Sequence, residues 1–118
     1  MANSAEAIVY GALKLLAGGR IYPDVAPQLV VRPYVTYQAV GGQSTNYMSD
    51  TDNLQNARIQ VNAWADDRKT AIDLIQGAIA ALTGEPIYAT NIGAPVSTYE
   101  PDTKLYGSRL DFSIWFNP

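Results

Sequence analysis

The pattern of hydrophobic and polar positions changes period once within a single stretch, and that change predicts a strand leading directly into a helix. Apolar and polar residues alternate through residues 58–64, which is typical of a half-buried strand. Across residues 66–82 the apolar residues instead recur every three or four positions, the spacing of one helical face. We expect Asp66 to be the helix N-cap, and Gly84 with Pro86 to end the helix. The strand and the helix each have one apolar side, so we expect them to bury each other.

The same reasoning predicts a second helix near the N-terminus. Residues 4–17 carry one apolar face, and Asn3 and Glu6 have the spacing of a capping box at its start. Gly18-Gly19 is expected to end this helix. The next segment, residues 20–28, contains two prolines, which favours an extended, turning chain.

Four further regions are predicted as strands, mostly from their β-branched and aromatic residues. Residues 41–56 are polar and glycine-rich, and we expect a long mobile loop there. The order of elements predicts one α+β domain over residues 1–118, with a mostly antiparallel β-sheet and two helices packed on one face. The strand regions are 29–40, interrupted by Pro33, then 87–92 and 96–99, and finally 104–116 after a turn at 100–103.

Composition narrows the classes of function. The chain has 118 residues, enough for one core, and its net charge is -3 with eight scattered basic residues. That balance argues against a nucleic-acid partner, since phosphate binding needs clustered Lys and Arg. The chain has no cysteine and no histidine, so it lacks thiol chemistry, the commonest general base and the commonest metal ligand. No secretory signal or membrane span is predicted. We therefore expect no enzyme, no cofactor and no metal site.

Candidate sites for chemistry are better explained by local structure. Residues 50–53, Asp-Thr-Asp-Asn, resemble the start of a calcium loop. However, Gln55 stands where that loop needs glycine, and Val61 stands where its bidentate glutamate belongs. The carboxylate pairs at 66–67 and 100–102 fall at a helix start and in a turn. We interpret residues 50–53 as a solvated loop and the carboxylates as local caps.

The polar faces of the two longest strands provide a candidate subunit interface. Each face mixes arginine and tryptophan with uncharged polar groups, and both residue types are enriched at interface hot spots. In one sheet, both tryptophans would lie on the face away from the helices. The alternative is that each tryptophan folds over the rim of the core. The candidate interface residues are Arg58, Gln60, Asn62 and Trp64 on one strand, and Arg109, Asp111 and Trp115 on the other.

Four strings along the chain resemble, in the same order, a family of small phage tail completion proteins. The first string is residues 20–28 followed by 33–38, and the second is Arg58-Ile59-Gln60-Val61-Asn62-Ala63-Trp64-Ala65. The third is residues 99–106 and the fourth is residues 110–116. The strings are spread from residue 20 to residue 116, so the resemblance extends over nearly the whole chain.

The resemblance implies a structural role, similar to that of the tail terminators of long-tailed phages and prophages. Such proteins cap the tail tube, form a ring, commonly of six subunits, and join the tail to the head connector. The implied partners are copies of this chain in a ring or hexamer, the tail tube protein and the head connector protein. Nucleic acid and membrane are not implied. The implied location is the virion tail, after assembly in the host bacterial cytoplasm. The family implies no catalytic residues, so none is carried over.

Three alternatives stay open from the sequence alone. Another head-tail connector or head-completion component would use the same assembly physics. A small-ligand binding domain, or a small enzyme built on carboxylates and tyrosines, would instead need a pocket. We also hypothesise that the loop at residues 41–56 orders against a neighbouring subunit or the tube.

Overall fold

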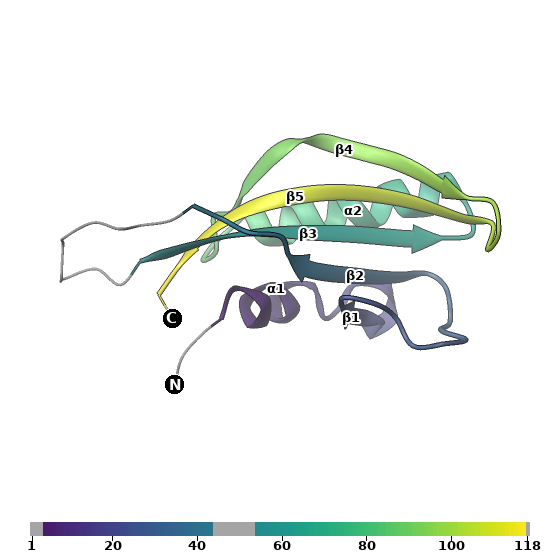
Figure 1. The fold of residues 1–118 in the computed structure, drawn as a ribbon, viewed down its shortest axis with the longest axis horizontal. Coiled ribbons are helices and arrows are strands. Elements are labelled where there is room, and N and C mark those ends of the chain that lie inside the picture. Colours follow the sequence, from purple (N-terminus) through teal and green to yellow (C-terminus); the bar gives the residue numbers. More distant parts are fainter. Residues whose placement is uncertain (1–3, 44–53, 118) are drawn as a thin grey trace.

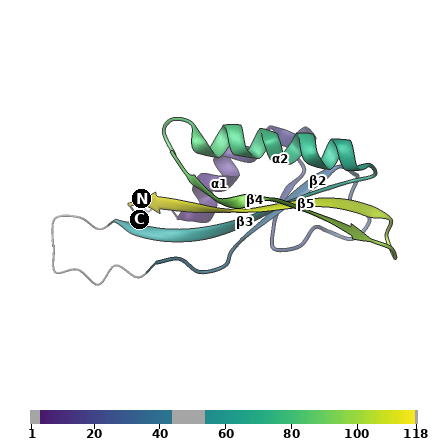
Figure 2. The ribbon, with the colours of Figure 1, turned by 90° about the horizontal axis from the view of Figure 1, so that it is seen from above.

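Five strands form one sheet, and two α-helices lie together on one of its faces (Figures 1 and 2). The computed structural model of the protein describes residues 4–43 and 54–117. The predicted α+β class, with a mostly antiparallel sheet, is confirmed. The elements are α1 (Ala5–Leu13), a 3₁₀ turn η1 (Leu16–Gly19), β1 (Ile21–Pro23), β2 (Tyr34–Ala39), β3 (Gln55–Ala65), α2 (Arg68–Thr83), β4 (Thr90–Glu100) and β5 (Leu105–Phe116).

The two long strands β3 and β5 form the middle of the sheet. The strand order is β1-β2-β3-β5-β4, with β1 and β2 parallel and every other pair antiparallel. The β3–β5 ladder runs from the pair Gln55–Phe116 to the pair Ala65–Tyr106. This register fixes which side chains of the two strands lie beside each other on each face.

The core lies between the sheet and the two helices. The alternation predicted for β3 is confirmed, because Ile59, Val61 and Ala63 are fully buried on the helix side. They meet Phe112 of β5 and Ile75 of α2 within one hydrophobic cluster. Full burial of side chains of the Ile, Val and Phe type contributes roughly 1.5–3 kcal/mol each. This strand–helix pair is the centre of the fold, as the periodicity indicates.

The prediction of Asp66 as the N-cap of α2 is wrong by one residue. Asp67 is the cap: its carboxylate accepts hydrogen bonds from the Thr70 backbone N–H at 3.2 Å and from the Thr70 hydroxyl at 2.7 Å. These two bonds favour the ionised form and lower the pKa of Asp67. Asp66 is exposed and pairs instead with Arg32. Gly84 ends the helix, as predicted.

The first helix is shorter than the predicted span of 4–17. Its N-cap is Ser4, whose hydroxyl accepts a hydrogen bond from the Ala7 N–H at 3.0 Å. The other proposed capping residue, Asn3, lies outside the described residues. Glu6 bonds elsewhere, because its carboxylate accepts from the Ala39 N–H of β2 at 3.3 Å. The helix ends at Leu13, with Lys14 as its C-cap, and not at Gly18-Gly19 as expected. A separate 3₁₀ turn follows, in which Ala17 has a φ of 49°, a value incompatible with an α-helix.

The hairpin between β2 and β3 continues beyond the end of β2. The Val40 N–H donates to the Arg58 carbonyl, and the Arg58 N–H donates to the Gly41 carbonyl, at 2.8 and 2.7 Å. At Gly42 the two segments of the hairpin come so close that an added Cβ would collide with the Asn56 backbone. The predicted loop at 41–56 is therefore shorter than expected, because both of its ends pair with each other as part of the hairpin. Residues 44–53 lie outside the described residues.

The outer strands differ from the prediction in two places. The weak strand at 87–92 and the strand at 96–99 are parts of one strand, β4, whose register shifts between Ile92 and Val96. The shift contains Gly93, at a φ of 80°, and Pro95. Residues 21–23 were expected only as extended chain, yet they form β1, a short edge strand parallel to β2.

Candidate functional site

The seven residues predicted as an interface lie on the face of the sheet away from the helices, which we call the open face. The register places Asn62 beside Arg109 and Gln60 beside Asp111. Trp64 lies beside Gly107, and β2 and β4 flank these pairs on either side. The β3–β5 register thus brings together every candidate except Trp115, which lies at the far end of β5.

The polar groups at the middle of the open face bind one another. Arg58 Nε and the Asp111 carboxylate form an ion pair at 2.6 Å, with side chains 47% and 14% exposed. The pair is diagonal, because the direct cross-strand neighbour of Arg58 is Ser113. The Asn62 amide donates to the Gln60 side-chain carbonyl at 3.3 Å. Pairs this close to solvent stabilise a fold by at most about 1 kcal/mol, so we infer that their main effect is to order the face.

Trp64 contacts the strands on both sides of β3. Its indole N–H donates to the Thr36 hydroxyl of β2 at 3.4 Å. On the other side its ring covers Gly107, where an added Cβ would lie 2.8 Å from ring atom Cζ3 and 2.5 Å from the Thr98 hydroxyl. Trp64 therefore spans from β2 to β5, and Gly107 leaves room for its ring.

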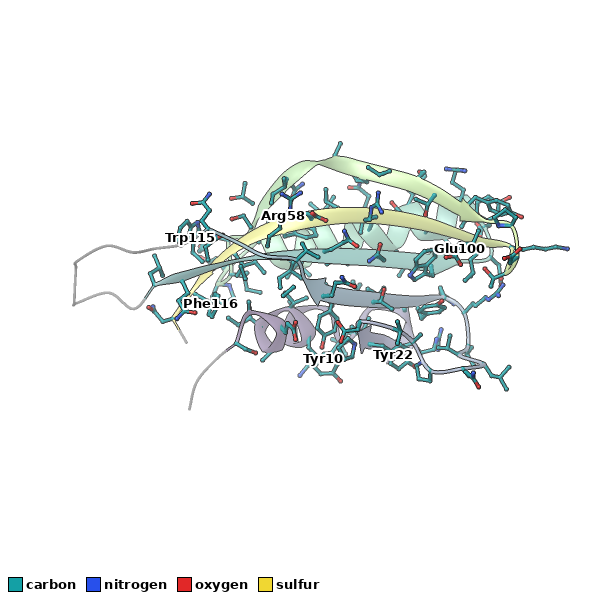
Figure 3. The ribbon with its side chains drawn as sticks, in the orientation of Figure 1. Tyr10, Tyr22, Arg58, Glu100, Trp115 and Phe116 are labelled. Atoms are coloured by element: carbon teal, nitrogen blue, oxygen red, sulfur yellow. The ribbon has the colours of Figure 1, made fainter. Side chains whose placement is uncertain are left out.

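Trp115 lies at the opposite end of the sheet and is 44% exposed. The register places it beside Asn56, eight pairs from the Trp64–Gly107 pair, or about 27 Å along the strand. Figure 3 shows Trp115 and Phe116 at one end of the molecule and Glu100 at the other. The two tryptophans share a face but belong to separate regions of the surface.

A hollow of about 350 Å³ lies at the Trp115 end, and we call it the end hollow. Its lining comes from three places that are distant in sequence: the first turn of α1, the segment after α2, and the end of β5. The residues that supply it are Ile8, Pro86, Ile87, Ile114, Trp115, Phe116 and Asn117.

An apolar loop that was not predicted as a site lies at the other end of the sheet. This loop, residues 24–31, joins β1 to β2 and exposes Val25, Leu29 and Val31 to solvent. Together with Trp64 it borders a groove of about 400 Å³ over the open face. Residues 29–33 were predicted as the start of a strand, and this part of the prediction is wrong, because β2 begins only at Tyr34.

Arg32 anchors the apolar loop where it enters β2. Its guanidinium binds the Asp66 carboxylate at 2.9 Å and the Thr103 carbonyl at 3.0 Å. These partners lie in the turn before α2 and in the turn between β4 and β5. Arg32 therefore ties three connections together at this end of the sheet.

Two further observations concern metal binding and membrane spans. Within residues 4–43 and 54–117, no group of three His, Cys, Asp or Glu side chains is arranged to hold a metal ion. The calcium-like string at 50–53 lies outside those ranges. No helix in the described part of the chain is both long and apolar enough to cross a membrane.

Comparison with known proteins relates this fold to a phage tail family. A chain from the solved structure "Virion of native gene transfer agent (GTA) particle" is similar with a TM-score of 0.67 and 16% identity, over 95% of this chain and 93% of that chain. At that identity the likeness supports the fold alone. No curated protein sequence matches the chain. The family model described as "Tail completion protein gp17" matches residues 9–117, so the chain belongs to the phage tail completion family and is a structural protein of the virion tail.

Proposed function

We propose that the protein completes the phage tail as a ring-forming terminator: copies of the chain close a ring, commonly of six, on the end of the tail tube. The ring caps the tube and joins it to the head connector, and the chain itself catalyses no reaction. The observation that carries this proposal is the family match, which extends over residues 9–117.

The distribution of exposed apolar groups supports a ring. A ring of identical subunits needs two different surfaces on each copy, because each contact is heterologous. The apolar loop and the end hollow are two such surfaces, located at opposite ends of the sheet. A single self-complementary patch would instead favour a two-fold dimer.

The state of the carboxylates supports a role without catalysis. A catalytic acid or base needs a pKa tuned to its task and a free position beside a substrate. Four aspartates are already engaged within the fold, three in ion pairs and one as a helix cap. They are Asp66, Asp73 and Asp111 in ion pairs and Asp67 as the cap.

Imaging of tails from a phage that lacks this gene tests the proposal. We expect tails that are overlong or not joined to heads, and we expect a plasmid copy of the wild-type gene to restore joined particles. Filled heads without attached tails of normal length would favour the head-completion alternative. Normal infectious particles in the absence of the gene would refute a role in tail completion.

A further inference from the structure

We propose that the apolar loop of one subunit docks into the end hollow of the next subunit, and that this contact closes the ring. The inference rests on the proposed function, because it identifies the two surfaces that a ring requires. Its elements are Val25, Leu29 and Val31 on one copy, and Ile87, Trp115 and Phe116 on its neighbour.

The first observation is a leucine that contributes nothing to the packing of its own chain. Leu29 is 100% exposed. Its φ is 60°, in the left-handed region where an L-residue with a Cβ is strained and where asparagine or glycine is normally preferred. Strain of this kind is often kept at functional positions. Leu29 therefore has a conformation and an exposure that the fold of a single copy does not explain.

The second observation is that the loop is held out from the sheet in a fixed position. Asp24 at its start donates its N–H to the Tyr37 carbonyl at 2.8 Å. Arg32 at its end binds Asp66 and the Thr103 carbonyl. A loop fixed at both ends loses little conformational freedom when it binds, which lowers the entropic cost of association.

The third observation is that the end hollow is large enough for the side chains of the loop, and that most of its lining residues carry apolar side chains. Six of its seven lining residues are apolar, and Asn117 is the one polar member. Its volume of about 350 Å³ is roughly twice that of the cavity of about 150 Å³ that binds a benzene molecule. Aliphatic side chains from a single loop fit within that space.

The fourth observation is geometric. The loop borders Trp64, whereas the hollow is lined by Trp115. Eight ladder pairs separate the two positions along β3 and β5, or about 27 Å. A rigid sheet keeps the two surfaces apart, so the loop of one copy reaches the hollow of another copy rather than its own. Such head-to-tail contacts close into a ring when the rotation between copies divides a full turn.

The contact is small, which predicts when it forms. A stable interface buries about 800 Å² on each partner, more than three aliphatic side chains in one hollow supply. We therefore expect purified subunits to be largely monomeric, and the contact to form where the tail end holds copies side by side.

Cysteine cross-linking tests the contact directly, because the chain contains no cysteine. Leu29→Cys and Asn117→Cys are introduced together, the doubly substituted gene is expressed in a phage lacking its own copy, and isolated tails are oxidised. We expect a ladder of linked subunits that ends at the size of the ring. Each single variant should give none. Leu15→Cys with Asn117→Cys is the matched control, since Leu15 is also exposed, at 87%, but lies outside the loop. If amine-reactive cross-linking of the same tails shows rings and the Leu29 pair gives no ladder, the contact is wrong and the ring stands.

Leu29→Asn separates association from folding. Asparagine tolerates the left-handed backbone better than leucine, so the melting temperature of the variant should stay equal or rise. We expect the yield of infectious particles in complementation to fall at least tenfold, while Leu15→Asn complements like the wild type. Full complementation by Leu29→Asn would overturn the proposed contact. Normal particles from the phage lacking the gene altogether would instead overturn the proposed function.

Discussion

Replacing Gly107 with alanine tests whether the open face is organised by the packing of Trp64. Gly107 lies in β5 between β3 and β4, so its backbone is held by ladders on both sides. The new methyl group would lie 2.8 Å from Trp64 Cζ3 and 2.5 Å from the Thr98 hydroxyl. Thr98 can rotate its side chain, but the indole ring can only move away as a whole, and its hydrogen bond to Thr36 would break.

The expected magnitude follows from three contributions. Overpacking of this kind costs about 1–3 kcal/mol, and the lost hydrogen bond about 1 kcal/mol. The lower entropy of the unfolded alanine chain offsets about 0.4–1 kcal/mol. The net loss is therefore about 1–3.5 kcal/mol. For 118 residues the entropy of unfolding is about 0.25 kcal/mol/K, so the melting temperature should fall by about 4–14 °C.

Urea denaturation of purified variants measures this loss, and Gly11→Ala is the matched control. An added Cβ at Gly11 meets nothing within 4 Å, and Gly11 lies in α1. The control should therefore be more stable than the wild type by up to about 1 kcal/mol. In a Trp64→Ala background, Gly107→Ala should cost little, because the ring it displaces is absent. Equal stability of Gly107→Ala and wild type would refute this account of the open face.

Three further variants test contacts elsewhere in the fold. Asp67→Ala should destabilise the protein at neutral pH. Hydrogen bonds from Thr70 lower the pKa of Asp67 in the folded state, so the ionised carboxylate stabilises the fold at pH values above the usual carboxyl pKa. The difference in urea midpoint between the variant and the wild type should therefore vanish as the pH falls through the lowered pKa. Gly42→Ala places a methyl group against the facing backbone of the hairpin and should lower the free energy of unfolding by roughly 1–3 kcal/mol. Hydrogen exchange should become faster at the amides of the hairpin extension and stay unchanged in the core. Unchanged exchange at every amide would contradict the close approach at Gly42. Arg32→Ala removes the ion pair with Asp66 and should lower the free energy of unfolding by about 0.5–1.5 kcal/mol, and by less in 1 M salt. A loss of stability that does not depend on salt would show that the ion pair contributes nothing.

The elements that bury one face could be predicted from the sequence, because burial imposes a period on the residues. β3, α2 and β5 each have a regular apolar side, and their existence and order were predicted correctly. The cap of α2 was misplaced by one residue because Asp66 and Asp67 are both suitable caps. Only the folded chain shows that Arg32, distant in sequence, binds Asp66 and leaves Asp67 to cap the helix.

The positions of the two tryptophans show what periodicity does not determine. Alternation places Trp64 and Trp115 on one face, but their distance depends on the register of β3 against β5. The apolar loop was missed for a related reason, since its residues 29–31 have the aliphatic composition of a strand and were predicted as one, although β2 begins only at Tyr34. The family resemblance was recognised from short strings, and the match over residues 9–117 confirms it.

The interruption in β4 affects how copies of the protein can associate through the edge of the sheet. β4 is the outer strand beside β5, and its register shift around Gly93 and Pro95 divides it into two short runs. Proline has no N–H to donate, and a bulge twists the strand, so a second sheet finds no long template to extend. The divided strand therefore works against edge-to-edge pairing between copies of the protein.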